Sequence, residues 1–228
     1  MKIGIFGGSF NPVHDGHVGI AKSAIERLSL DSLLVVPAAV NPFKAGGAAE
    51  DPPFDRLLLV RAAFCGMAKV VVDDREMRRG GVSYAIDTVR EIASENPGAE
   101  LFFITGEDIA GETGGWKDAG ELKRLCKFET FPRTAESSTE IRALLREGKS
   151  VAGLVPEAVG LLLRHRVSYN EDAKIVAAVL KGLQAKGGYC PCRLQKIPEF
   201  VCPCEEFRSQ LADGSYHGLC HCRLYKKP

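Results

Sequence analysis

The chain has 228 residues, which is enough for one domain or two. Its 30 basic and 29 acidic side chains nearly cancel, so the charge gives no sign of a nucleic-acid partner. No apolar run approaches the roughly 20 residues that a membrane span needs, and we expect no membrane association. The N-terminal residues run into a glycine-rich turn without the pattern of a secretory signal, which favours a cytoplasmic protein.

Apolar runs alternate with helical periodicity along the first three quarters of the chain. Strands are predicted at residues 2–6, 33–36, 69–72, 101–105 and 128–131. Helices are predicted at residues 16–28, 54–67, 83–93, 138–146 and 156–166. This alternation predicts an α/β fold with a Rossmann-like, doubly wound parallel sheet. Ligands of such sheets bind beyond the carboxyl ends of the strands.

The turn after the first predicted strand has the composition of a phosphate site. Gly7, Gly8 and Ser9 follow that strand and precede a helix, where free backbone amides can approach a phosphate. His14 and His17 lie three residues apart at the start of the helix, so both imidazoles can face one ligand. The alternative is a pair of ordinary surface or capping histidines.

A second helix start lies at Ser137-Ser138-Thr139-Glu140-Ile141-Arg142. Ser137 or Ser138 can cap this helix, and Ile141 marks its apolar face. Arg142 adds a fork-shaped cation one turn into a helix whose first amides are free. Together these residues predict a polyphosphate site.

These two elements resemble the hallmarks of the nucleotidylyltransferase superfamily. Further short motifs make the resemblance to bacterial nicotinate-nucleotide adenylyltransferase closer: residues 7–17, Asn41-Pro42-Phe43-Lys44, residues 80–88, Gly106-Glu107-Asp108 and Trp116-Lys117. The resemblance covers residues 1–168. It implies transfer of AMP from ATP to nicotinate mononucleotide, giving deamido-NAD and pyrophosphate, with Mg²⁺ as cofactor.

The resemblance also implies residue roles. His14 and His17 would hold the α-phosphate, Lys44 would add a cation, and Ser138 with Arg142 would grip the leaving phosphates. Tyr84, Asp108 and Trp116 would shape the nicotinate pocket, although a core tyrosine, a helix cap and a buried indole are the plain alternatives. The remaining predicted ATP-binding or substrate-binding residues are Gly7, Gly8, Ser9, Phe10, Thr88, Gly106 and Thr139. Two departures from the family pattern are Ala85, where threonine is usual, and the short stretch of residues 131–137.

The end of the chain has a different composition. Six of the eight cysteines form three Cys-x-Cys pairs, Cys190-Pro-Cys192, Cys202-Pro-Cys204 and Cys220-His-Cys222. Clustered cysteines in a reducing compartment indicate metal ligands or redox catalysts, and zinc ribbons usually have two residues between paired cysteines. A helix is predicted at residues 172–186 and a shorter one at 205–211. We expect burial alone to support so short a segment poorly and a metal centre to supply the remainder. The other two cysteines, Cys65 and Cys126, are expected to be buried packing residues.

Residues 171–228 resemble the catalytic chain of ferredoxin:thioredoxin reductase, which implies a small helical and loop iron–sulfur domain. By position, Cys190, Cys202, Cys204 and Cys220 would ligate a [4Fe-4S] cluster. Cys192 and Cys222 would form the redox-active disulfide, with His221 supplying a proton. A ferredoxin and a thioredoxin-like disulfide protein are the implied partners.

The leading interpretation is a bifunctional fusion of an adenylyltransferase and an iron–sulfur disulfide reductase. One alternative makes the first domain a degenerate nucleotide-binding regulator of the reductase, because residues 131–137 are so few. The other alternative keeps the adenylyltransferase and makes the C-terminal segment a passive redox sensor.

Overall fold

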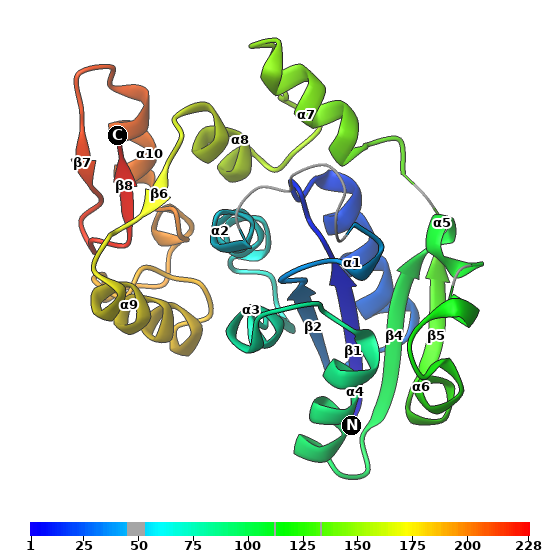
Figure 1. Ribbon diagram of the computed structural model, residues 1–228. Helices are drawn as coiled ribbons and strands as arrows, with labels where there is room; N and C mark the ends of the chain where they lie inside the picture. Colours follow the sequence, from blue (N-terminus) through cyan, green and yellow to red (C-terminus); the bar gives the residue numbers. More distant parts are fainter. Residues whose placement is uncertain (45–52, 112, 133) are drawn as a thin grey trace.

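The computed structural model describes residues 1–44, 53–111, 113–132 and 134–228 (Figure 1). At its centre is a parallel sheet with strands β1 (Lys2–Gly8), β2 (Ser32–Pro37), β3 (Val70–Val72), β4 (Glu100–Gly106) and β5 (Lys127–Phe131). The order is β3-β2-β1-β4-β5, with β1 parallel to both β2 and β4. The predicted parallel α/β sheet is therefore confirmed. The strand order reverses at β1 and β4, which is where such sheets bind ligands.

Helices connect and cover these strands. Their bounds are α1 (Asp15–Arg27), α2 (Pro53–Phe64), α3 (Arg75–Arg79), α4 (Ala85–Glu95), α5 (Glu107–Ala110), α6 (Ala119–Leu125), α7 (Ser138–Arg146) and α8 (Glu157–Arg164). Two 3-10 turns, η1 (Pro42–Lys44) and η2 (Thr113–Gly115), complete the loops beyond β2 and β4. The sequence did not predict α3 and α6, because both are short and polar; in α6 only Leu122 is buried.

The two faces of the sheet bury separate groups of side chains. Successive residues of a strand point to opposite faces. Ile5 packs with Val89 of α4 and Leu122 of α6 on one face. Phe6 packs with Ala24 of α1 and Leu58 of α2 on the other. Both faces of β1 are therefore covered, which is why its sequence is a continuous apolar run.

The C-terminal segment folds around a second, small sheet. Strands β6 (Ser168–Tyr169), β8 (Tyr225–Lys227) and β7 (Gly218–Leu219) form an antiparallel sheet in the order β6-β8-β7. The helices here are α9 (Ala173–Ala185), η3 (Pro198–Phe200) and α10 (Glu205–Ala212). The sequence predicted helices and loops alone, because strands of two or three residues are too short to show alternation.

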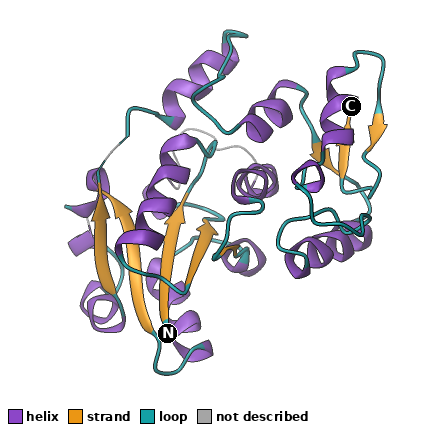
Figure 2. Ribbon diagram, turned by 180° about the vertical axis from the view of Figure 1, so that it is seen from behind, coloured by secondary structure: helices purple, strands orange, loops and turns teal. Residues whose placement is uncertain are grey.

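This cysteine-rich unit, residues 168–228, packs directly on α2 and its C-terminal turn (Figures 1 and 2). The Cys65 thiol donates a hydrogen bond to the Gly188 carbonyl at 3.0 Å. A Cβ on Gly188 would lie 2.4 Å from the backbone nitrogen of Gly66, so only glycine permits this approach. Arg61 of α2 donates to the Tyr169 hydroxyl at 3.4 Å.

Two expectations are corrected by this contact. The C-terminal cysteines other than the exposed Cys192 belong to the same buried cluster as Leu59 and Phe64 of α2. Packing against the rest of the chain therefore supplies burial that the segment was expected to lack. Cys65 is half-buried at the contact and is not a plain packing residue, whereas Cys126 is buried as expected. Within the described residues, no helix has the length and apolar character needed to cross a membrane.

Candidate active site and cysteine cluster

A cavity of about 550 Å³ lies at the carboxyl ends of β1 and β4. It is lined by most of the residues that the sequence predicted for nucleotide binding: Gly7, Gly8, Ser9, Phe10, His14, His17, Tyr84, Thr88, Gly106, Trp116, Ser138, Thr139 and Arg142. Residues far apart in the chain therefore share one cavity. The side chains of Lys44 and Asp108 fall outside the described part of the structure, so their roles stay predictions.

His14 and His17 form a compact pair at the start of α1. Their ring centroids are 3.7 Å apart, and the Nδ1 atom of His17 accepts a hydrogen bond from the His14 backbone N–H at 3.2 Å. A neutral His17 ring consequently carries its proton on Nε2. Burial lowers the pKa of His14 to about 4 and that of His17 to about 3. Near neutral pH both rings are uncharged hydrogen-bond donors in the cavity wall.

The depressed pKa values predict that acid destabilises the ligand-free protein. Between pH 6.5 and about 4 the unfolded chain binds more protons at these histidines than the folded chain does, so the free energy of unfolding falls as the pH falls. Urea unfolding at a series of pH values across this window should show the decline. His17→Gln should make it shallower, and His221→Gln, on an exposed loop, should not. If the free energy of unfolding falls equally with pH in wild type and His17→Gln, the decline is not caused by burial of His17.

The second predicted motif meets the first at the same edge of the cavity. The Ser138 hydroxyl donates to the Pro12 carbonyl at 2.9 Å, and the Arg142 guanidinium donates to the Asn11 carbonyl and to Thr139 Oγ1. Ser137 occupies the N-cap of α7, and its side chain makes no capping hydrogen bond. The helix start is thus fixed by contacts with the loop before His14, not by the capping that its sequence suggested.

The short segment before α7 closes the side of the cavity beside His14. A Cβ on Gly16 would lie 1.9 Å from Thr134 Oγ1 and 3.1 Å from a Glu136 carboxylate oxygen, so the glycine admits this segment to the start of α1. Thr134, Glu136 and Ser137 line the cavity. The Glu136 charge raises the pKa of His14, against the larger effect of burial. The sequence did not identify Glu136, because an acidic residue in a loop carries no specific signal.

Several aromatic side chains form another part of the cavity wall. Trp116 packs edge-on against Phe103 and Phe128, with centroid distances of 5.5 and 6.0 Å, and Phe43 lies 6.4 Å away. The Tyr84 ring, also part of the cavity, has the Lys117 ammonium 4.5 Å from its centroid. This wall suits a flat, polarisable ring such as that of a nucleotide base or a pyridine.

Three polar atoms of the cavity wall are buried without a hydrogen-bond partner among the described residues. They are His14 Nδ1, Thr105 Oγ1 and Trp116 Nε1. Buried polar groups are rarely left unpaired, so each of these atoms calls for a water or a ligand atom as its partner. The sequence analysis did not identify Thr105, although a hydroxyl side chain at the end of an apolar strand could have indicated a site residue. Thr88 differs, because its hydroxyl already donates to the buried carboxylate of Glu76 and accepts from Arg79.

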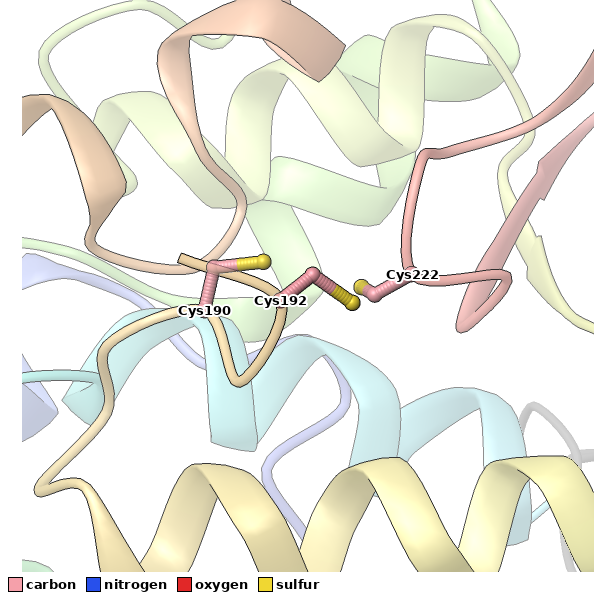
Figure 3. Close-up of side chains that lie close together, drawn as sticks. All are labelled: Cys190, Cys192 and Cys222. Carbon is pink, nitrogen blue, oxygen red and sulfur yellow. The ribbon is translucent and has the colours of Figure 1, made fainter. Parts of the chain in front are cut away.

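The second candidate site is formed by the three Cys-x-Cys loops. The sulfur atoms of Cys190, Cys192 and Cys222 lie within 4.8 Å of one another (Figure 3). Cys190 and Cys222 are buried, while Cys192 is exposed. This trio combines one predicted cluster ligand with the two predicted redox thiols. Hydrogen bonds from Cys204 and Cys222 lower the pKa of Cys190, which makes it the favoured thiolate of the group.

The other predicted ligands lie in the same buried layer. Cys204 is the N-cap of α10 and its thiol contacts Cys190, while Cys220 lies 3.6 Å from Cys222, sulfur to sulfur. Cys202 points toward the Tyr225 hydroxyl, with a sulfur to oxygen distance of 3.8 Å. His221 is exposed and lies 4.0 Å from a Glu206 carboxylate oxygen. The loops thus bring the thiols of Cys190, Cys192 and Cys222 together, with Cys204 against Cys190 and Cys220 against Cys222, and they leave the Cys192 side chain exposed.

Comparison with known sequences gives one family for the first part of the chain. The model of the cytidylyltransferase-like family matches residues 5–169. A probable nicotinate-nucleotide adenylyltransferase of Gemmatimonas aurantiaca is 35% identical over 199 residues, covering 75% of this chain and 93% of the relative. Another, of Gloeobacter violaceus, is 40% identical over 145 residues, covering 63% of this chain and 69% of the relative.

Comparison with solved structures agrees. A structure of a putative nicotinate-nucleotide adenylyltransferase from Vibrio parahaemolyticus superposes with a TM-score of 0.59 at 30% identity, covering 72% of this chain and 99% of the other. The Plasmodium falciparum nicotinic acid mononucleotide adenylyltransferase complexed with NaAD has a TM-score of 0.56 at 14% identity, covers 72% of this chain and 96% of the other, and shows the shared fold alone.

Proposed function

Since the chain belongs to the cytidylyltransferase-like family and, within it, to the nicotinate-nucleotide adenylyltransferases, we propose that it joins ATP to nicotinate mononucleotide. The products are deamido-NAD and pyrophosphate. One observation carries the proposal: the phosphate-binding motifs and the aromatic wall share a cavity with three unpartnered buried polar atoms. Such a cavity matches a substrate with a charged chain at one end and a flat ring at the other.

The reaction needs positioning and charge stabilisation rather than a covalent nucleophile. A phosphate oxygen of nicotinate mononucleotide attacks the α-phosphorus of ATP, which enters as its magnesium complex. The new P–O bond forms as the bond to the β-phosphate oxygen breaks, and pyrophosphate leaves with that electron pair. The neutral imidazoles of His14 and His17 donate to the α-phosphate oxygens. Arg142 lies at the same edge, with its fork available to the leaving phosphates once it releases Asn11.

Substrate preference tests this proposal. We expect kcat/KM to be higher for nicotinate mononucleotide than for its amide counterpart or phosphopantetheine. Trp116→Phe keeps an aromatic ring but removes the Nε1 donor, which has no hydrogen-bond partner in the described part of the chain, and should lower kcat/KM for nicotinate mononucleotide by about 10-fold. Chromatography of the dinucleotide product measures both effects. A preference for either competing substrate would overturn the assigned substrate and leave the fold assignment intact.

The cysteine-rich unit supports a second proposed function, ferredoxin-dependent disulfide reduction at a [4Fe-4S] cluster. The residues present suit such a group in kind, because cysteine sulfurs are the soft ligands that it takes, Cys190 contacts Cys204, and the four proposed ligands are all buried. Cys190, Cys202, Cys204 and Cys220 would hold the cluster. When bound, the cluster would supply electrons one at a time to a reaction that consumes two.

Cys192 and Cys222 carry the bond changes of this second proposal. Cys192 is the exposed thiol, so its thiolate attacks the target disulfide and releases the first target thiol after protonation. Cys222, whose sulfur is within 4.8 Å, then attacks Cys192 and releases the second thiol. The resulting Cys192–Cys222 disulfide would be returned to two thiols by two protons and two electrons, one electron from each of two reduced ferredoxins. His221, exposed near Glu206, would relay protons in this proposal.

A further inference from the structure

Arg56, in the first part of α2, is fully buried yet does not line the cavity. Its guanidinium donates to the Ser9 carbonyl at 2.7 Å and to the Ala39 carbonyl at 2.9 Å. Ser9 belongs to the glycine-rich loop after β1, and Ala39 belongs to the loop after β2. One buried side chain, outside the cavity lining, therefore holds together the loops that follow β1 and β2.

The first of these loops is held in an unfavourable conformation. Phe10, the next residue after Ser9, has a φ of 47°, in the left-handed region that bulky side chains disfavour. Such a backbone persists only where its surroundings fix it. Arg56 binds the carbonyl of the peptide that links Ser9 to Phe10, so it acts on this peptide unit directly.

Phe10 connects the conformation of this loop to His17, because the two rings are in contact. Its ring is 2% exposed and packs edge-on against His17, with the centroids 4.9 Å apart. The second loop is linked to the first, because the Asn41 side chain donates to the Ser9 hydroxyl at 3.0 Å. A change in the Ser9 to Phe10 peptide would thus move both His17 and the cavity wall beside Asn41.

We infer that Arg56 is a positioning residue for adenylyl transfer, which holds the glycine-rich loop and, through Phe10, aims His17 at the α-phosphate. The reaction named in this inference rests on the proposed function, whereas the contacts do not. The role requires arginine, because its planar fork serves two carbonyls at once, and a lysine ammonium is a point charge on a flexible stem. None of the sequence motifs contains Arg56.

The test compares Arg56→Lys with Arg61→Lys on the same helix. We expect Arg56→Lys to lower kcat by about 10-fold to 100-fold while KM for both substrates changes less than about 3-fold, because the reacting groups are misaligned rather than lost. Arg61 contacts Tyr169 and Asp74, away from the cavity, so Arg61→Lys should keep kcat within about twofold. Circular dichroism confirms that both variants are folded.

A readout that does not need turnover separates this inference from the proposed function. Nitrogen NMR of the His17 ring should show a higher pKa in Arg56→Lys than in wild type, since a loosened loop admits water. If Arg56→Lys does not fold, Phe10→Leu tests the same connection and should change the His17 signal and kcat together. Unchanged kcat and an unchanged His17 titration in the folded variant, or an equal loss in Arg61→Lys, would overturn the inference. If wild type makes no deamido-NAD, the proposed function fails and the NMR result still decides the role of Arg56.

Discussion

We expect replacement of His17 by alanine to lower kcat for deamido-NAD synthesis by about 100-fold or more. The ring stacks against His14 and lines the cavity, and burial keeps it neutral, so its Nε2 proton is a fixed donor. A fixed donor stabilises the developing charge on the α-phosphate without reorganisation. His14→Ala and Arg142→Ala should have effects of the same order, because each removes another group at the phosphate end of the cavity.

The controls address folding. His17 also contacts Phe6 and Phe10, so His17→Gln is the variant that retains most of the buried volume. His165→Ala, on a half-buried residue after α8 that does not line the cavity, should leave kcat unchanged. Arg142→Lys keeps the charge but loses the fork, and should lose much of the activity. Near-normal turnover by folded His17→Ala and His17→Gln would contradict the proposed role of the histidine pair at the α-phosphate.

If the cysteine-rich unit holds the proposed cluster, we expect replacement of Cys202 by serine to remove iron from anaerobically purified protein. We expect replacement of Cys192 by serine to keep the iron and to abolish disulfide reduction. Cys202 is buried against Tyr225, so the loss of a ligand there leaves a cluster short of one thiolate. Cys192 is exposed, and reduction of a target disulfide requires an accessible attacking thiolate.

Iron and sulfide content, the visible absorption spectrum and turnover with reduced ferredoxin measure the two effects. Cys126→Ser, buried beside α6 and away from the three loops, is the matched control and should retain both iron and activity. Loss of iron in Cys192→Ser, with iron and activity retained in Cys202→Ser, would show that ligands and redox thiols have been exchanged. Iron binding without turnover in wild type would instead favour a passive redox sensor.

The assay for deamido-NAD synthesis also distinguishes the two hypotheses for the first part of the chain, an adenylyltransferase and a degenerate regulator. A degenerate nucleotide-binding regulator would bind ATP without forming deamido-NAD. The structure bears on this alternative through Thr134 and Glu136, which close the cavity beside His14 although the segment is short. If the wild-type protein forms deamido-NAD, the first domain is an enzyme and not a degenerate nucleotide-binding regulator.

The sequence by itself determined the central sheet and identified the residues of the two motif groups. The apolar runs predicted all five parallel strands, because a strand buried on both faces is visible as a local pattern. The glycine-rich turn, the paired histidines and the spaced cysteines are likewise local features, and their residue types carry the chemistry. Membership of the family followed from them.

Only the tertiary structure decided how these parts contact one another. The docking of the cysteine-rich unit on Cys65 and Gly66 and the entry of Glu136 beside Gly16 depend on close approaches between distant segments. The unpartnered Thr105 hydroxyl and the two carbonyls held by Arg56 depend on which groups share the interior. Periodicity and spacing report what lies within a few residues along the chain. Burial and hydrogen bonding between distant residues are fixed by packing, so their consequences for the site appear only in the folded molecule.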